Sequence, residues 1–134
     1  MSSDLERYKG LASFRFALRR FLASSESICR DAGITPQQYQ AMLAIRAHDG
    51  SMAMKDLAEH LMLTHHAAVQ LVDRLEKNGL AAREPSTDDR RSVSLKLLAM
   101  GETLLEDLAS RHLGRMLELE PELSKSLKRL RRLA

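Results

Sequence analysis

The first quarter of the chain carries apolar residues at intervals of three and four, which is the period of one face of an α-helix. This pattern predicts a long amphipathic helix over residues 5–30. Its apolar positions are Leu11, Phe14, Leu18, Phe21, Leu22 and Ile28, with Ser25 in the same register. Gly33 suits the end of this helix, because glycine readily adopts the left-handed conformation found there. Residues 35–38 (Thr-Pro-Gln-Gln) form a capping box that opens a second helix, expected to end near residue 48.

The middle of the chain predicts two further helices. Residues 51–53 are compatible with a short strand, and residues 55–62 have the spacing of a short helix whose start lacks a good cap. Thr64 is a good N-cap for the next helix, which runs to Asn78 and is stopped by Gly79. The inward face of this helix carries Ala68, Leu71, Val72 and Leu75. A helix, a very short connection and a capped second helix form a helix-turn-helix pattern.

After Gly79 the helical period gives way to alternation. Residues 80–84 are predicted as a strand, residues 85–91 as a polar turn, and residues 92–97 as a second strand, so that a β-hairpin follows the helix-turn-helix as a wing. The helical period returns over residues 99–119. Pro121 is expected to break this helix before a last one with Leu123, Leu127 and Leu130 on one side. The sequence therefore predicts a mainly α fold with a small β-hairpin wing.

Composition narrows the class of protein without identifying it. The 134 residues are 44% hydrophobic with a net charge of +3, which permits a polyanionic partner but does not demonstrate one. The single cysteine excludes an intramolecular disulfide. No signal peptide or membrane-spanning run is visible, so we expect a cytoplasmic protein without a membrane partner. No nucleophile–base pair, carboxylate pair or Gly-rich phosphate loop is visible, so the sequence predicts neither an enzyme nor a cofactor.

The face of helix 64–78 opposite to its apolar stripe presents groups suited to DNA. These are His65, His66, Val69, Gln70 and Asp73. A glutamine can make two hydrogen bonds to adenine, a histidine can bond bases or phosphates, and a valine can touch a thymine methyl group. The helix N-terminus itself favours a phosphate. We therefore expect this helix to enter the major groove of double-stranded DNA.

The tip of the predicted wing combines two acidic and two basic residues. Arg90 and Arg91 are candidates for the minor groove, because an arginine on a narrow hairpin can enter it where A·T-rich sequence deepens the negative potential. The neighbouring Asp88 and Asp89 can hold such an arginine through a charged hydrogen bond. The wing is thus expected to add a second DNA contact.

Several motifs together resemble the MarR family of winged helix-turn-helix transcription regulators. They are Asp56-Leu57-Ala58, Leu63-Thr64, the run Val72-Asp73-Arg74-Leu75-Glu76-Lys77-Asn78-Gly79-Leu80, and the wing pattern Asp89-x-Arg91 followed by Leu97 and Gly101. The resemblance runs from about residue 34 to residue 101. Leu98 departs from it, because a helix-capping threonine is usual there. Ala67 and Val69 also depart from it, since small hydroxyl residues are common on this face, and we infer fewer base-specific hydrogen bonds.

The resemblance implies a homodimer whose first and last helices interlock and hold the two winged lobes on successive major grooves. It implies one intertwined domain with a dimerisation helix at 1–33, a DNA-binding winged helix-turn-helix at 34–98 and dimerisation helices at 99–134. The major-groove candidates are Thr64, His65, His66, Val69, Gln70 and Arg74. Arg91 matches the family's minor-groove arginine, Asp89 the residue that supports the wing, and Arg74 a helix arginine that contacts DNA or braces the wing.

The expected function is a repressor that binds palindromic operators and is released by a small aromatic effector. Two recognition helices on one face of the duplex require half-site centres roughly 34–36 Å apart. By analogy of fold, a ligand crevice is expected between the dimer helices and the winged lobe. Its candidate residues are Phe14, Phe21, Tyr39 and Met42.

Two other interpretations stay open. The winged helix could be a protein-interaction module without direct DNA contact, or Cys29 could make the chain a redox-switched regulator. Cys29 lies at the end of the first helix beside Ile28, which favours a buried and inert thiol. His65 and His66 point about 100° apart on a helix and cannot easily share an ion, so no metal site is predicted.

Overall fold

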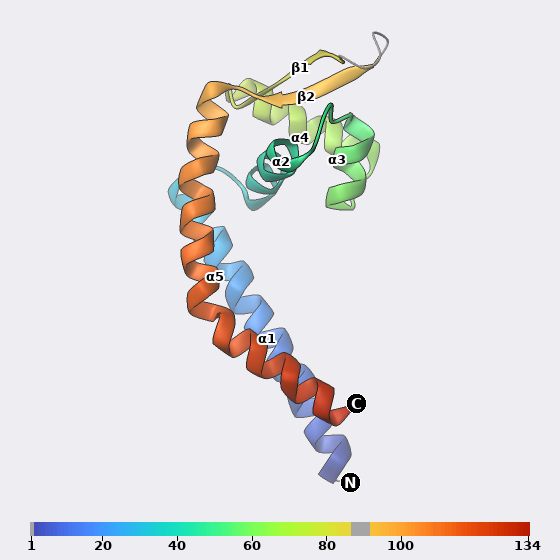
Figure 1. Ribbon diagram of the computed structural model, residues 1–134, viewed down its shortest axis with the longest axis vertical. Coiled ribbons are helices and arrows are strands. Elements are labelled where there is room, and N and C mark those ends of the chain that lie inside the picture. The colour runs from blue at the N-terminus through green and yellow to red at the C-terminus, as the bar shows by residue number, and fades with distance from the viewer. Residues whose placement is uncertain (1, 87–91) are drawn as a thin grey trace.

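The computed structural model describes residues 2–86 and 92–134 and consists of a winged lobe and a helical stalk (Figure 1). Its elements are α1 (Ser2–Asp31), α2 (Pro36–Ala47), α3 (Met54–Leu61), α4 (His65–Lys77), β1 (Ala81–Pro85), β2 (Val93–Leu97) and α5 (Ala99–Leu133). The lobe holds α2, α3, α4 and the hairpin, whereas α1 and most of α5 run side by side away from it. The mainly α fold with a hairpin wing is therefore confirmed.

The predicted caps fix the starts of α2 and α4. Thr35 Oγ1 accepts a hydrogen bond from the Gln38 backbone N–H at 3.1 Å, and the Thr35 N–H donates to Gln38 Oε1 at 2.9 Å. Thr64 Oγ1 accepts from the Ala67 N–H at 3.1 Å. The start of α3 also has a cap that the sequence analysis missed, because the Asp56 carboxylate accepts from the Ala53 N–H at 3.0 Å. Each bond satisfies a helix N–H group that has no partner within the helix.

The hydrophobic core lies where α5 meets the lobe. Its fully buried side chains are Met42, Leu57, Leu71, Leu75, Leu108, Val72 and Cys29. They come from every helix of the chain, so a single core joins the lobe to the stalk. Since packed interiors deform little, the elements that share this core move together.

The hairpin pairs β1 with β2 in antiparallel register from Ala81 opposite Leu97 to Pro85 opposite Val93. The strand expected at residues 51–53 is reduced to a single bridge, in which the Leu95 N–H donates to the Met52 carbonyl at 2.8 Å. The wing-tip candidates Asp89, Arg90 and Arg91 lie outside the described residues. Their predicted contacts therefore stay predictions.

The hairpin is joined closely to the first turn of α5. The Leu98 N–H donates to the Leu80 carbonyl oxygen at 3.0 Å. A Cβ atom built on Gly101 would lie 2.0 Å from the same oxygen, so the backbones can approach only because residue 101 has no side chain. Leu98 is the N-cap of α5 and forms no side-chain cap, as the departure from the family pattern predicts.

The expectation that Pro121 breaks the last helix is wrong. α5 is one helix with Pro121 inside it, so a single C-terminal helix replaces the expected pair. Proline removes one backbone hydrogen bond and usually kinks a helix. Contacts with α1 hold the part of α5 that follows this site, because Arg20 Nη1 pairs with Glu122 Oε2 at 2.7 Å and Arg129 Nη2 with Glu6 Oε2 at 3.0 Å. Within residues 2–86 and 92–134, no helix has the length and apolar character needed to cross a membrane.

Candidate nucleic-acid interface

The faces of α4 divide as the sequence predicts. Its inner face is fully or almost fully buried and consists of Ala68, Leu71, Val72 and Leu75. Its outer face carries the predicted DNA-contacting residues, of which Thr64, His65, His66, Gln70 and Arg74 are exposed and Val69 is half-buried. The structure thus brings all six major-groove candidates together on one exposed surface at the edge of the lobe.

The N-terminal turn of α4 suits an anion. Its first residues after the Thr64 cap are His65 and His66, and the turn contains no acidic residue. The first backbone N–H groups of a helix carry partial positive charge and attract phosphate. Together with the exposed Gln70 one turn further on, this end of α4 offers both phosphate-binding and base-reading groups.

The wing is tied to α4 by an arginine that the sequence analysis did not single out. Arg83 on β1 places Nη2 2.8 Å from Asp73 Oδ1, and its Nη1 pairs with Glu76 Oε1. Asp73 and Glu76 are one helical turn apart, so both can face one guanidinium group. In the described part of the chain the ion pairs between wing and α4 are both made by Arg83, while Arg74 is exposed.

Arg83 also changes the charge that the interface would present to DNA. Asp73 and Glu76 lie on the same helix as the predicted base-reading residues, and unpaired carboxylates would repel phosphates there. Pairing with Arg83 offsets one of these two negative charges. With the exposed Arg74 and Lys77, three cations then face two carboxylates, so this region is net positive. The sequence signal for this contact was an arginine in the strand that follows a helix with acidic residues three positions apart.

In the described part of the chain, the four residues expected to line a ligand crevice are divided between the hydrophobic core and α1. Met42 is fully buried and Tyr39 nearly so, both within the hydrophobic core. Phe14 and Phe21 are half-buried on α1. The Tyr39 ring stacks on the His112 imidazole, with centroids 3.9 Å apart and planes inclined by 5°. These positions leave the predicted crevice without support from the described part of a single chain.

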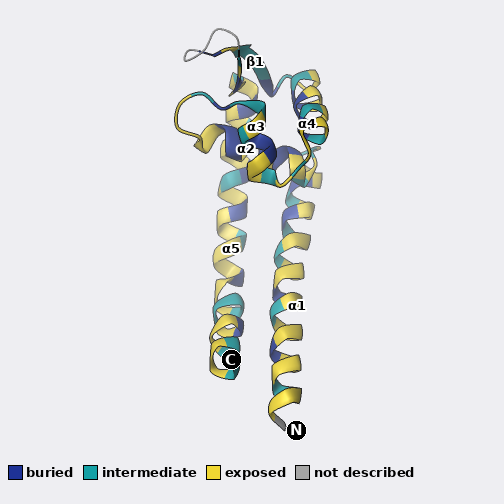
Figure 2. Ribbon diagram, turned by 90° about the vertical axis from the view of Figure 1, so that its right-hand side faces the viewer, coloured by how far each residue is buried: buried dark blue, intermediate teal, exposed yellow. Residues whose placement is uncertain are grey.

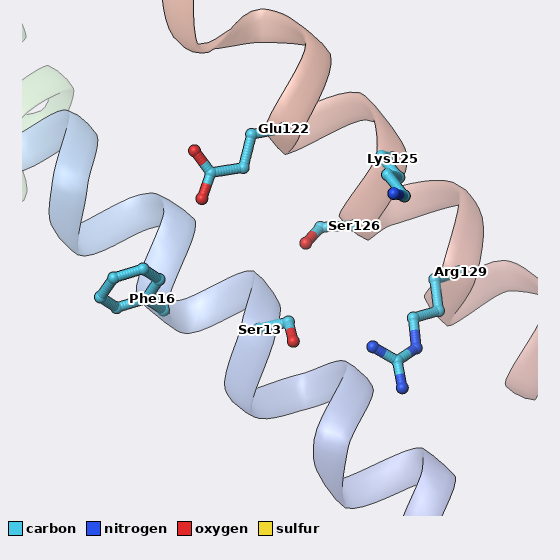
Figure 3. Close-up of a pocket in the computed structure, with 6 residues that line it drawn as sticks. All are labelled: Ser13, Phe16, Glu122, Lys125, Ser126 and Arg129. Carbon is cyan, nitrogen blue, oxygen red and sulfur yellow. The ribbon is translucent and has the colours of Figure 1, made fainter.

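The stalk contains a small polar pocket of about 300 Å³ between α1 and α5 (Figure 3). It is lined by Ser13, Phe16, Glu122, Lys125, Ser126 and Arg129. Glu122 and Arg129 already form ion pairs across the stalk, with Arg20 and Glu6. We assign these charges to holding the two helices together.

Cys29 is fully buried at the end of α1. Burial raises the pKa of its thiol, and a hydrogen bond with Ser25 opposes this rise in part. Burial likewise raises the pKa of the nearby Tyr39 phenol, and the Cys29 charge contributes to that rise. Because the thiolate is the reactive form, a buried thiol with a raised pKa fits a packing role.

The raised pKa of Cys29 predicts that alkaline pH weakens the fold. In the unfolded chain a thiol ionises near pH 8.5 and a phenol near pH 10, whereas the folded chain keeps both protons longer. Stability is therefore fully present below about pH 8.5 and is lost as the pH rises towards the folded pKa. Urea denaturation across this range should show a shallower decline for Cys29→Ala than for the wild type. Equal declines would contradict the assignment.

The sequence comparisons point in one direction. Residues 32–92 match the profile of the MarR family. The chain is 33% identical over 99 residues to the HTH-type transcriptional regulator FarR of Neisseria gonorrhoeae. The matched region covers 74% of this chain and 65% of that protein. The chain is 33% identical over 76 residues to the HTH-type transcriptional repressor MdtR of Bacillus subtilis, which covers 57% and 48%. The chain thus spans about half to two thirds of the length of these relatives.

The comparison with solved structures agrees with the sequence comparisons. A variant of S. aureus MepR solved in complex with an oligodeoxyribonucleotide has a TM-score of 0.68 against this chain at 22% identity. The likeness covers 87% of this chain and 94% of that one, so it includes the stalk as well as the lobe. At this identity the likeness establishes the shared winged-helix fold alone.

Proposed function

Because this chain belongs to the MarR family of winged helix-turn-helix transcription regulators, we propose that it binds double-stranded DNA and regulates transcription. The observation that carries the proposal is the exposed outer face of α4, opposite a fully buried inner face. α4 enters the major groove, where Gln70 contacts a base and Thr64, His65 and His66 contact bases or phosphates. Arg90 and Arg91 of the wing reach the adjacent minor groove.

We further propose that two copies of the chain associate through the stalk. Both stalk helices are exposed along much of their length (Figure 2), and several of their exposed residues are apolar. On α1 these include Tyr8, Leu11, Leu18 and Leu22, and on α5 Leu113, Met116, Leu117 and Leu127. Each set recurs at helical spacing, and apolar patches of this kind in soluble proteins mark interaction surfaces. A symmetric dimer would bury both stripes and present two α4 helices to a palindromic operator.

The proposed regulator acts as a repressor that a small aromatic effector releases. One relative named above is a transcriptional repressor, which supports this direction of control. A ligand lowers DNA affinity only by the difference between its affinities for the two lobe spacings, so its crevice must change shape between them. The expected crevice residues Phe14, Phe21, Tyr39 and Met42 would need surfaces from the second copy or a rearranged core.

The DNA proposal is tested by selecting binding sites with the purified protein and measuring affinity by fluorescence anisotropy. Gln70→Ala should relax the preference at one base pair, a loss of about 1–3 kcal/mol against the cognate site. Arg74→Ala should weaken binding to all sequences and reduce the salt slope by about one. Lys128→Ala, an exposed charge near the far end of α5, is the matched control and should leave both quantities unchanged.

The same measurement decides between the proposal and its rival. If the purified chain binds no DNA even at low salt, the winged lobe is a protein-interaction module and the proposal fails. A selected site without two-fold symmetry would leave DNA binding intact and remove the palindromic operator. A response to peroxide that disappears in Cys29→Ser would favour the redox-switched alternative.

The dimer proposal predicts that Leu22→Glu weakens self-association. Leu22 is 58% exposed in the single chain, and symmetry places the change twice in one interface. Losing the burial of one leucine costs about 1.5–3 kcal/mol, so the dimer dissociation constant should rise at least about tenfold. Sedimentation equilibrium measures this, with Leu43→Glu on α2 as the control that should still dimerise. Equal association by both variants would place the interface elsewhere.

A further inference from the structure

A buried histidine that the proposed function does not use lies where the winged lobe meets the stalk. His112, near the middle of α5, is 6% exposed. Its Nε2 lies 2.8 Å from Oγ of Ser25 on α1, and its Nδ1 lies 2.7 Å from the carbonyl oxygen of Leu108 on α5. The ring of Tyr39 on α2 stacks on it at 3.9 Å. One imidazole therefore contacts three helices.

Its hydrogen bonds fix the orientation of the His112 ring. A carbonyl oxygen only accepts hydrogen bonds, so Nδ1 carries the proton towards Leu108. In the neutral ring Nε2 then accepts from the Ser25 hydroxyl. Turning the ring would break both bonds inside the protein, where a polar group without a partner is costly. α1 and α5 together thus set the plane on which Tyr39 stacks.

Tyr39 links His112 to the part of the molecule that carries the proposed DNA-contacting residues. Tyr39 lies on the same helix as Met42 and Ile45, and these residues share one core with Leu71 and Leu75 of α4. A close-packed core does not deform continuously, so α2 and α4 keep their mutual position. A change in the tilt of α2 at the stacked rings would therefore change the tilt of α4 as well.

We propose that Ser25, Tyr39 and His112 form a joint that fixes the angle between the winged lobe and the stalk. The inference rests on the proposed function, because in a dimer this angle determines the separation of the two α4 helices. The joint thereby sets which half-site spacing is bound best. All three residues are buried in the chain, so they would act as positioning residues and not as DNA contacts. Separating Tyr39 from His112 loosens the angle between lobe and stalk without altering any of the proposed DNA-contacting side chains.

The test uses palindromic duplexes that carry the selected half-site at spacings differing by single base pairs. The wild type should prefer its best spacing by about tenfold, which is within the usual range of coupling between sites. Tyr39→Phe keeps the stacked ring and should keep this preference. Tyr39→Leu keeps apolar volume without the ring, and Ser25→Ala removes the hydroxyl, so both should flatten the preference to about threefold or less.

A matched control breaks another contact between the same helices. Arg20→Ala removes the ion pair between Arg20 and Glu122, which lies outside the joint, and should leave the spacing preference unchanged. Folding of every variant is checked by thermal unfolding. If Tyr39→Leu does not fold, Ser25→Ala alone decides the question. A folded variant with the joint broken and the full wild-type preference overturns the inference.

Small-angle X-ray scattering of the free protein separates failure of the joint from failure of the proposed function. Tyr39→Leu should give a more varied set of lobe positions than Tyr39→Phe, and therefore a different scattering profile. Identical scattering of the two variants overturns the joint whether or not the chain binds DNA. A wild-type chain that binds no DNA overturns the proposed function, and the scattering result then stands for the joint alone.

Discussion

Replacing Gly101 with alanine is expected to lower the free energy of unfolding by about 3 kcal/mol, the upper end of the usual cost of overpacking. The new Cβ atom would lie 2.0 Å from the Leu80 carbonyl oxygen, which is backbone and cannot turn aside as a flexible side chain can. Relief requires the start of α5 to move away from β1. That movement would stretch the hydrogen bond from the Leu98 N–H to the same oxygen.

Urea denaturation followed by circular dichroism measures the effect, and α5 supplies its own control. Gly114 lies on the same helix with nothing within 4 Å of its added Cβ. Gly114→Ala should therefore stabilise the protein by about 0.5–1 kcal/mol, because alanine favours the helix over glycine. If both variants unfolded at the wild-type urea concentration, the close approach of Leu80 to α5 would be wrong.

Replacing Arg83 with alanine is expected to reduce DNA affinity by about 2 kcal/mol, roughly thirtyfold. The change leaves Asp73 and Glu76 as unpaired negative charges on the helix that is proposed to face the phosphates, and it removes the ion pairs between wing and α4. Fluorescence anisotropy against the selected operator, repeated at several salt concentrations, separates these causes. The repulsive part weakens with added salt, whereas the loss of wing position does not.

Lys96→Ala provides the matched control for this measurement. Lys96 is a cation of the same hairpin that pairs with Glu84 at 3.5 Å, away from α4. Its removal changes the net charge equally and should cost less than about threefold in affinity. Adding Asp73→Asn and Glu76→Gln to Arg83→Ala should restore the electrostatic part of the loss. Equal losses for Arg83→Ala and Lys96→Ala would show that total charge, not the contact with α4, is what matters.

Local sequence signals were sufficient for much of the fold and of the candidate site. The caps at Thr35 and Thr64, the stop at Gly79 and the apolar stripe of α4 each depend on residues within a few positions of one another. Such signals are read directly from spacing and residue type. The exposed surface that holds Thr64 and Gln70 follows from them, because burying one face of a helix leaves the other outside.

Contacts between distant segments could not be read in the same way. Pro121 was expected to end a helix, and only the ion pairs and packing with α1 explain why α5 continues. His112 had no visible partner in the sequence, since Ser25 lies 87 positions away and Tyr39 reaches it through a different helix. The Arg83 brace likewise required the angle between strand and helix, which propensity alone does not determine.

The backbone contact at Leu80 gives α5 two mechanical roles. The helix forms much of the stalk. Its first turn is also joined to the hairpin by the hydrogen bond from the Leu98 N–H to the Leu80 carbonyl and by the close approach of Gly101 to the same oxygen. A rotation of α5 about its own axis would therefore move the wing. Through the Arg83 ion pairs and the shared core, the same rotation would also move α4, so torsion of the stalk would shift both proposed DNA contacts as one unit.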